Sequence, residues 1–216
     1  MNNGMWIKIF HNRNVNSFKK GDITLAAEWA RKSIHLSTLI FPVAVYHFGV
    51  VPVLFGLIPL CAIAVVADIL RAYSPHFRRF IASFFGKMMR EEEVQEHVFA
   101  LNGATAVLLS ACLTFAIFPK TIAIVAFSIL LLGDTCAALF GRHFGKTQIG
   151  NTGKSLEGSV AFVLASLLIG FVLPEIGWAR LVIAAIVGAI VELAPIPLND
   201  NLRIPLATGV VLWSLP

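Results

Sequence analysis

Charged residues are scarce in this chain, and their scarcity excludes an ordinary soluble domain. Asp, Glu, Lys and Arg make up 13% of the 216 residues, whereas hydrophobic residues make up 57%. A typical soluble domain is about 25% charged. A soluble core of this size could not bury so much apolar surface. The composition therefore indicates an integral membrane protein, and the length fits one domain.

Cysteine is also scarce. The three cysteines, Cys61, Cys112 and Cys136, lie far apart inside apolar runs, and no C-x-x-C spacing occurs. We interpret them as small buried hydrophobic residues, which excludes a disulfide framework and a cysteine metal site. The first twenty residues lack a short apolar core followed by a small-residue cleavage site, so we expect this segment to be retained in the protein.

Seven apolar runs have the length, or nearly the length, of a transmembrane helix. A spanning helix needs about 20 apolar residues. The last run is the weakest, because its helix would rise only ~20 Å against a hydrocarbon core of ~30 Å. The sequence thus predicts an all-α fold, a polytopic membrane bundle of about seven transmembrane helices. The runs cover residues 34–49, 51–71, 98–118, 120–140, 156–173, 179–195 and 204–216.

The basic residues are distributed unevenly over the connections between these runs. If the N-terminus is cytoplasmic, all of the 17 Lys and Arg residues except Lys120 and Arg180 lie on the cytoplasmic side. Such an asymmetry follows the positive-inside rule. The formal net charge of +5 then reflects basic cytoplasmic loops. We expect no nucleic-acid partner, because the cations lie between apolar spans.

Two further segments are amphipathic. Residues 21–35 read GDITLAAEWARKSIH, with Asp22 as a candidate N-cap. Residues 74–97 alternate aromatic with basic side chains and then become acidic. Both patterns are typical of interfacial helices. We predict that both segments lie along the cytoplasmic membrane surface.

The stretch GNTGKSLEG, which begins at Gly150, is similar to the end of a nucleotide-binding P-loop. A true P-loop reads G-x-x-x-x-G-K-[ST] and follows a strand. Here Gln148 occupies the first glycine position and a helical span precedes it. Its chemistry still suits an anion, because Gly153 leaves backbone N–H groups accessible, Lys154 adds a cation and Ser155 can cap the next helix. A flexible loop with a solvated lysine would show the same pattern.

Asp134 is the most informative polar residue, because it lies within the apolar run that ends LLLGDTCAALFGRHFGK. A membrane-embedded carboxylate is costly and normally faces a polar cavity, a partner or a metal. On a helix, Asp134, Ala138 and Arg142 fall near one face. The alternative to a functional role is a buried ion pair with a nearby cation.

Other polar residues lie at the same depth. In the predicted topology they all face the cytoplasm and form one hydrophilic pocket, which suits a Mg²⁺-nucleotide. Two alternatives remain: Asp68 and Arg71 can form an i,i+3 ion pair, and a lone His35 is more often structural. The pocket residues are Arg31, Lys32, His35, Asp68, Arg71, Asn102, Asp134, Glu157, Glu192 and Asp200.

Five motifs in fixed order resemble the CTP-dependent lipid kinase family, which includes dolichol kinases, phytol kinases and yeast-type diacylglycerol kinases. They are ARKSIH, ADILR, GDTCAALFGRHFGK, GKSLEGS and PLNDNLRIPL, and the resemblance covers the chain from about residue 28 onward. It implies transfer of the γ-phosphate of CTP to the hydroxyl of a membrane lipid alcohol, with Mg²⁺ as cofactor. With the charge distribution and the amphipathic pattern, we expect a cytoplasmic N-terminal segment with an interfacial helix, 1–33, and a transmembrane catalytic domain with a cytoplasmic active site, 34–216.

The pocket and the resemblance together give a candidate site. Asp134 matches the family's central acidic residue, a Mg²⁺ ligand or the base, and Asp200 and His35 are the other catalytic candidates. Asp68 and Glu157 join Asp134 as candidate metal ligands. The candidate nucleotide-binding residues are Arg31, Lys32, Arg142, Lys146, Lys154, Ser155, Glu157, Gly158 and Asn201.

Two other functions compete with the kinase interpretation. Phosphatidate cytidylyltransferases share a similar central block but usually carry a SPKKT-like run where this chain reads TGKSLEGS. A transporter or lipid-binding scaffold would use Asp134 as a proton relay or structural pair. The gathering of polar residues at one face, without a comparable polar path to the other, disfavours that class. The acceptor (polyprenol or dolichol, phytol, or diacylglycerol) and the oligomeric state are not specified by any residue.

Overall fold

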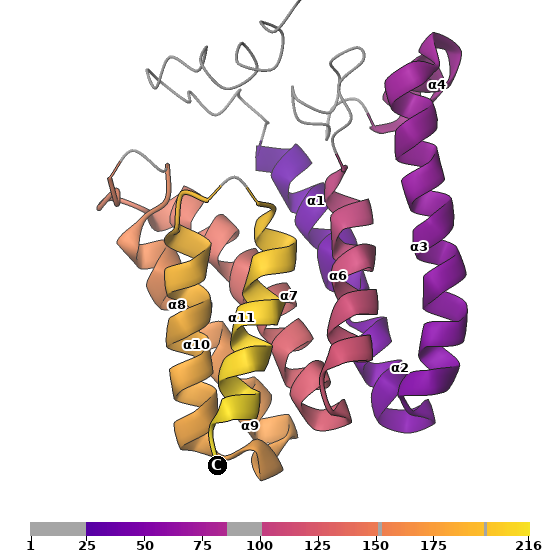
Figure 1. The fold of residues 1–216 in the computed structure, drawn as a ribbon. Coiled ribbons are helices and arrows are strands. Elements are labelled where there is room, and N and C mark those ends of the chain that lie inside the picture. Colours follow the sequence, from indigo (N-terminus) through magenta and orange to yellow (C-terminus); the bar gives the residue numbers. More distant parts are fainter. Residues whose placement is uncertain (1–24, 86–100, 151–152, 197) are drawn as a thin grey trace, which may run out of the picture.

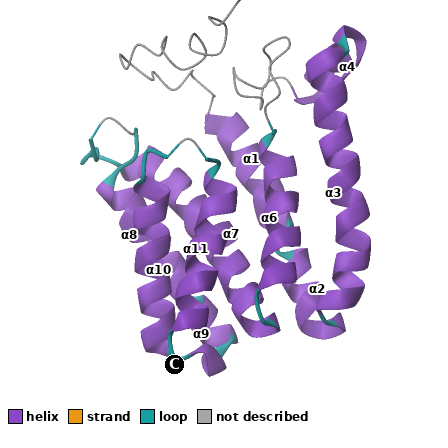
Figure 2. Ribbon diagram, viewed as in Figure 1, coloured by secondary structure: helices purple, strands orange, loops and turns teal. Residues whose placement is uncertain are grey.

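The structure is a computed structural model that describes residues 25–150, 153–196 and 198–216, except for 86–100. Helices form most of this part of the chain (Figure 2), which contains no β-strand. One isolated antiparallel bridge joins Gln148 to Ser155. The all-α prediction is confirmed.

The helices lie side by side as a bundle in which the chain reverses direction at both ends (Figure 1). The start of α1, the 145–155 loop and the 194–199 connection lie at one end, which we call the polar end, and the C-terminus lies at the other. The helices are α1 (Leu25–Ser37), α2 (Ile40–Phe48), α3 (Val50–Tyr73), α4 (Pro75–Phe85), α6 (Gly103–Ile117), α7 (Lys120–Phe144), α8 (Leu156–Leu167), α9 (Ile169–Val172), a 3-10 turn (Pro174–Ile176), α10 (Trp178–Leu193) and α11 (Asp200–Ser214).

Each predicted span corresponds to a helix or to a pair of short helices. By length and composition, α3 and α7 are the two described helices that can cross a membrane, and Gly103–Ile117 and Leu156–Val172 are shorter apolar helices. The predicted run 34–49 is divided, because α1 ends at Ser37 and α2 begins at Ile40. The count of seven spans therefore stays a prediction.

The N-terminal amphipathic segment forms α1, which packs against α7 and α6. Its place at the membrane surface stays a prediction. Its charged side chains Glu28 and Lys32 are buried, as is His35. The predicted domain boundary between residues 33 and 34 falls inside α1. The predicted N-cap Asp22 lies outside the described residues.

The second amphipathic segment is helical over Pro75–Phe85, and its acidic end lies outside the described residues. This helix, α4, follows α3 after a break at Ser74. Buried Arg78 donates from Nε to the backbone oxygen of Arg71 at 3.2 Å and from Nη2 to that of Ala72 at 3.4 Å. A cation suits this position, because the last carbonyls of a helix carry partial negative charge.

Helix α7 lies at the centre of the bundle. Its side chains are buried without interruption from Ile122 to Leu131, and it packs against α1, α2, α6, α8, α10 and α11. A helix that is apolar on every side needs apolar surroundings on every side. The outer helices expose large apolar side chains, such as Phe55 of α3 and Phe171 of α9. Extensive exposed apolar surface of this kind suits contact with lipid.

Glycines allow the central helices to pack closely around Phe162 of α8. A Cβ at Gly133 of α7 would lie 2.7 Å from Cζ of this ring, and a Cβ at Gly188 of α10 would lie 2.9 Å from its Cε1. Phe162 is fully buried. Because both neighbouring helices touch the ring, it cannot move away from a larger residue on either side.

We expect Gly133→Ala to destabilise the bundle by about 1–3 kcal/mol, the usual cost of overpacking a core. Thermal unfolding of the detergent-solubilised protein measures the effect as a lower Tm. Gly56→Ala is the matched control, because no atom lies within 4 Å of a Cβ at that position of α3. Equal Tm values for the two variants would contradict the tight packing around Phe162.

Candidate active site

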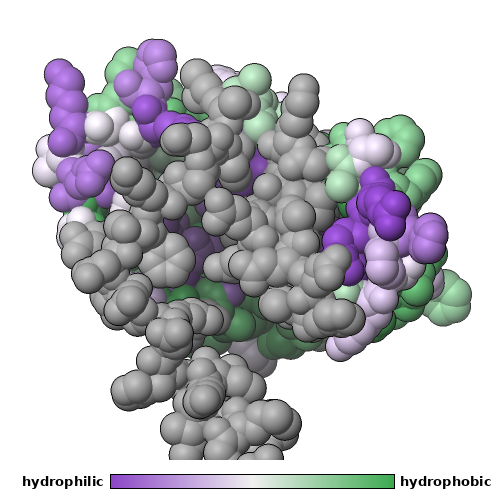
Figure 3. All heavy atoms as spheres, turned by 90° about the horizontal axis from the view of Figure 1, so that it is seen from above, coloured by the Kyte–Doolittle hydropathy of each residue, from purple (hydrophilic) through white to green (hydrophobic). Residues whose placement is uncertain are grey.

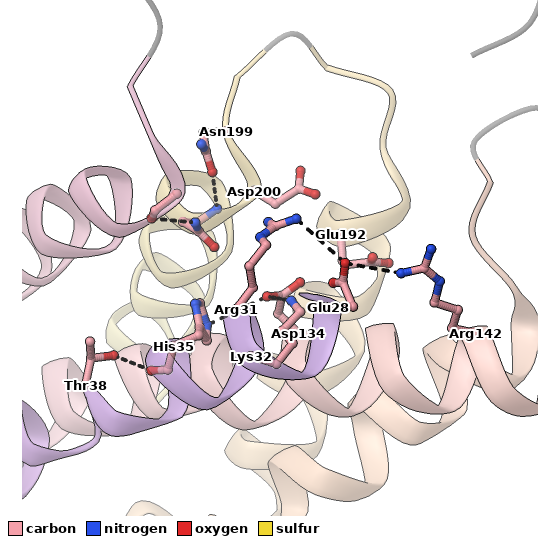
Figure 4. A network of polar contacts seen from close by, with 12 residues as sticks. Glu28, Arg31, Lys32, His35, Thr38, Asp134, Arg142, Glu192, Asn199 and Asp200 are labelled. Carbon is pink, nitrogen blue, oxygen red and sulfur yellow. Dashed lines mark hydrogen bonds and ion pairs between the residues drawn. The ribbon is translucent and has the colours of Figure 1, made fainter. Parts of the chain in front are cut away.

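The polar end begins with the contact between α1 and α7. Lys32 forms an ion pair with Asp134, whose side chain is 14% exposed. His35 approaches the same carboxylate, with 3.7 Å between Nε2 and Oδ2 (Figure 4). These three predicted site residues are therefore brought together, although 102 positions separate Lys32 from Asp134.

Glu28 is a member of this cluster that the sequence analysis missed. Its Oε2 lies 3.7 Å from Nη1 of Arg31 and 3.5 Å from Nη1 of Arg142. It thus joins two predicted phosphate-binding cations from different helices (Figure 4). The helical pattern of AEWARKSIH could have predicted this position, because Glu28, Lys32 and His35 have the spacing i, i+4, i+7 of one helical face.

The loop that carries the GKS motif folds back on itself between α7 and α8. The N–H of Ile149 donates to the oxygen of Lys154 at 2.9 Å, and the N–H of Leu156 donates to that of Thr147 at 2.9 Å. Gly150 and Gly153 have φ values of +56° and +69°. Few other residues adopt such angles without strain. These glycines turn the chain so that Lys154 returns toward the bundle.

Lys154 joins the loop to α10 and α11. Its Nζ lies 2.9 Å from Oε1 of Glu192 and 3.1 Å from Oδ2 of Asp200, and it also donates to the backbone oxygen of Glu192. Arg203 forms a second ion pair with Asp200. Glu192 and Asp200, the partners of Lys154, are drawn in the same view as Lys32 and Asp134 (Figure 4). We treat the charges of α1 and α7 and those of Lys154, α10 and α11 as one cluster at the polar end.

Small residues hold the GKS loop against α7. A Cβ at Gly158 would lie 2.8 Å from the backbone oxygen of Ala137, and one at Gly141 would lie 3.1 Å from Oγ of Ser155. Ser155 caps α8 by accepting a hydrogen bond of 3.1 Å from the N–H of Gly158. The predicted cap is confirmed. Ser155 and Gly158 thus position the loop, since their groups face α7 and the helix start.

Glu157 also supports the loop. Its two carboxylate oxygens accept from the N–H of Thr147 at 3.1 and 3.3 Å. Lys146, the residue before Thr147, is exposed. These contacts give Glu157 a structural use in the loop, and its prediction as a metal ligand gains no support from them.

Asn201 lies in the first turn of α11. Its N–H donates to Oδ1 of Asn199, the N-cap, at 3.0 Å, and its side-chain Nδ2 donates to the oxygen of Gly103 at 3.4 Å. The DN pair therefore ties α11 to the start of α6. This brings the N-terminus of α6 close to the cluster.

Asp68 belongs to a different set of contacts. Its Oδ2 accepts from the N–H of Asn102 at 3.0 Å, and its Oδ1 accepts from Nδ2 of Asn102 at 3.0 Å and from Nε of Arg71 at 3.3 Å. The i,i+3 ion pair considered from the sequence is confirmed. Asn102 in turn caps α6. Asp68 thus fixes α6 to α3. These contacts give no support to its predicted role as a metal ligand.

Three carboxylates suit a Mg²⁺ ion that arrives with a nucleotide. Within the described parts of the chain, no three His, Cys, Asp or Glu side chains form a metal-binding group by themselves. Mg²⁺ in kinase-type sites needs only one or two carboxylates, because phosphate oxygens and water supply the other ligands. The oxygens of Glu192 and Asp200, which both contact Lys154, and those of Asp134 are candidates for that role.

Seen from the polar end, two groups of hydrophilic residues lie at opposite edges of the face, with hydrophobic residues beside them (Figure 3). The cluster combines more cations than carboxylates and draws on α1, α7, the loop before α8, α10 and α11. A polyanion at a membrane surface is the ligand for which such a balance is suited. The paired residues are the cations Arg31, Lys32, Arg142, Lys154 and Arg203 and the carboxylates Glu28, Asp134, Glu192 and Asp200.

The chain is similar to several known proteins. An uncharacterized protein of Rickettsia prowazekii is 30% identical over 187 residues, which cover 83% of this chain and 90% of that protein. CTP-dependent diacylglycerol kinase 1 of Schizosaccharomyces pombe is 29% identical over 212 residues, covering 87% of this chain and 93% of the relative. Phytol kinase of a Synechocystis species is 29% identical over 109 residues, 46% of this chain and 47% of that enzyme.

No family model matches the chain, and no solved structure matches it. The resemblance seen in the five motifs is nevertheless confirmed, because relatives from fungi and a cyanobacterium carry kinase names and one fungal relative aligns over nearly its whole length. Residues of four of the five motifs, Lys32, Asp134, Lys154 and Asp200, form ion pairs at one end of the bundle. The chain belongs to the CTP-dependent lipid kinase family.

Proposed function

We propose that the protein transfers the γ-phosphate of CTP to the hydroxyl of a membrane lipid alcohol, a diacylglycerol, phytol or polyprenol. The observation that carries this proposal is that charged residues from separate motifs pair at one end of the bundle, Lys32 with Asp134 and Lys154 with Asp200. The kinase names of the relatives support the donor and the acceptor class. The polar end would face the cytoplasm, where CTP is available and where the positive-inside rule places the basic loops.

The carboxylates hold the places of phosphate oxygens when no nucleotide is bound. Glu28 pairs with Arg31 and Arg142, and Lys154 pairs with Glu192 and Asp200. Triphosphate oxygens would replace these partners, because cations bind phosphate through the same charge-assisted contacts. The cations then neutralise charge that develops on the transferred group.

Transfer needs a lipid hydroxyl in line with the bond between the γ-phosphorus and the bridging oxygen. The lipid oxygen forms the new bond to phosphorus, the bridging bond breaks, and CDP leaves. The hydroxyl proton passes to a carboxylate of the cluster, for which Asp134 and Asp200 are the candidates. His35 lies beside Asp134 and would hold this carboxylate in orientation.

The predicted Mg²⁺ would be held by Asp134 together with Glu192 or Asp200, and when bound it supplies further neutralisation of the triphosphate charge. We assign to Glu192 the metal-ligand role that the sequence analysis gave to Asp68 and Glu157. Glu192 lies in the cluster with Asp134, whereas Asp68 binds Asn102 and Glu157 binds the N–H of Thr147.

We expect Asp134→Asn to lower turnover by at least about 100-fold, the usual contribution of a group that acts in proton transfer. Transfer of radiolabel from [γ-³²P]CTP to a lipid alcohol in detergent measures it. Glu175→Gln is the matched control, because this carboxylate is exposed on the 3-10 turn at the opposite end. Turnover of Asp134→Asn equal to that of the control would contradict a central role for Asp134.

We expect Lys154→Met to raise the KM for CTP by about 10–100-fold, because a hydrogen bond to a charged group contributes about 1.5–3 kcal/mol. Steady-state kinetics at a saturating lipid concentration measures this KM. Lys120→Met at the opposite end provides the control, since Lys120 donates to the backbone oxygen of Tyr46 at an exposed position. An unchanged KM for Lys154→Met would remove Lys154 from the nucleotide site.

The released product distinguishes a kinase from a cytidylyltransferase. We expect CDP and a lipid phosphate, because the relatives are kinases and the loop reads GKSLEG. Chromatography of a reaction with CTP labelled on the cytosine ring identifies the product. Release of pyrophosphate, with the cytosine label on the lipid, would overturn the kinase proposal in favour of nucleotidyl transfer.

A further inference from the structure

A groove lies between α8 and α10, on the side of the bundle away from α1. Its volume is about 320 Å³, which falls within the range of about 300–1,000 Å³ that is typical of ligand pockets. Its lining is almost wholly apolar. Val160, Val163 and Leu164 contribute from α8, and Ile186 and Ile190 contribute from α10.

The groove has exposed rims and a buried floor. Val160, Leu164, Ile186 and Ile190 are each about half exposed, whereas Ala189 is 6% exposed. The small side chain of Ala189 leaves the hollow between the two rows of larger residues. The α10 side of the groove covers eight residues, or ~11 Å at a rise of ~1.5 Å per residue.

The groove ends where the charged cluster begins. Ser159 lies at this end of the groove, and its Oγ donates to the backbone oxygen of Ser155 at 3.3 Å. On the facing helix, Leu193 lines the groove and follows Glu192, which pairs with Lys154. The same two helices therefore carry an apolar channel and, immediately beyond it, the polar site.

We propose that this groove binds the hydrocarbon segment of the acceptor lipid nearest its hydroxyl, so that the hydroxyl reaches the cluster around Lys154 and Glu192. The inference rests on the proposed function, to which it adds the acceptor's position. A peptide is a poor occupant, because an apolar lining offers no partners for backbone N–H and C=O groups. A lipid chain needs none, and exposed rims let it enter sideways from the bilayer.

The groove would promote the reaction by orienting the lipid hydroxyl, because the tail gains no hydrophobic free energy on moving from the bilayer into the groove. A lipid tail leaves one apolar environment for another, so only packing distinguishes the groove from the bilayer. Packing of the first methylenes fixes the direction of the hydroxyl. Orientation of this kind contributes strongly to rate, because a misplacement of about 1 Å can cost about 100-fold.

Photo-crosslinking tests the binding site without relying on catalysis. The probe is a C16 primary alcohol that carries a diazirine near its hydroxyl, added to the detergent-solubilised protein, followed by peptide mass spectrometry. We expect label on the α8 and α10 residues of the groove, reduced by an excess of unmodified alcohol. Label spread evenly over other lipid-facing helices, such as α3, would overturn the proposal.

Kinetics with filled-groove variants tests its role. We expect Ile186→Trp and Val160→Trp to lower kcat/KM for a long-chain alcohol by about tenfold and to leave the KM for CTP unchanged. Both side chains lie on exposed rims, so the variants should fold. Ile63→Trp on α3 is the matched control, at a position that is 68% exposed. Variants that behave like this control would overturn the groove's role.

The two experiments separate this inference from the proposed function. Specific label in the groove, combined with no transfer of phosphate from CTP to any lipid alcohol, would contradict the kinase proposal and leave the groove as a lipid site. Transfer of phosphate with normal kinetics in Ile186→Trp and Val160→Trp would leave the kinase proposal and remove the groove.

Discussion

The polar end depends on the compensation of Asp134, a carboxylate placed inside an apolar helix. A charge at such depth costs about 2.5–3.5 kcal/mol on insertion scales, so the chain must supply a partner. Lys32 supplies it from α1. This pairing explains why α1 packs its charged face onto α7. Once α1 is in place, Glu28 reaches Arg142 at the end of α7.

In the proposed function, the same compensation would prepare the site for a triphosphate. Burial of a cation without a partner is costly. Each paired cation of the cluster has a carboxylate partner that a phosphate oxygen could replace. Lys154 contacts Glu192 and Asp200 at once, each within about 3 Å, so its position is fixed by two partners rather than one. The site is therefore assembled before the ligand arrives, which favours catalysis that relies on positioning.

Much of this architecture could be predicted from the sequence, and the exceptions have physical reasons. Apolar runs located the helices, because run length and turn residues are local properties. The one-sided distribution of basic residues and the five motifs identified Lys32, Asp134 and Lys154 as neighbours. The partner of each charge could not be predicted, because partners are set by packing. Asp68 resembled a site residue in sequence but joins Asn102, and Glu28 appeared to be one charge on an interfacial helix.

The open groove between α8 and α10 has a consequence for substrate selection. Only the first ~11 Å of a tail can lie along it, since the helix rises ~1.5 Å per residue and the residues that line α10 end at Ile186. Whatever continues past that point mixes with the surrounding membrane. Discrimination among acceptors then falls on methyl branches, double bonds or ester groups close to the headgroup. The groove does not sense the total length of the tail, so one such enzyme can accept alcohols of very different size.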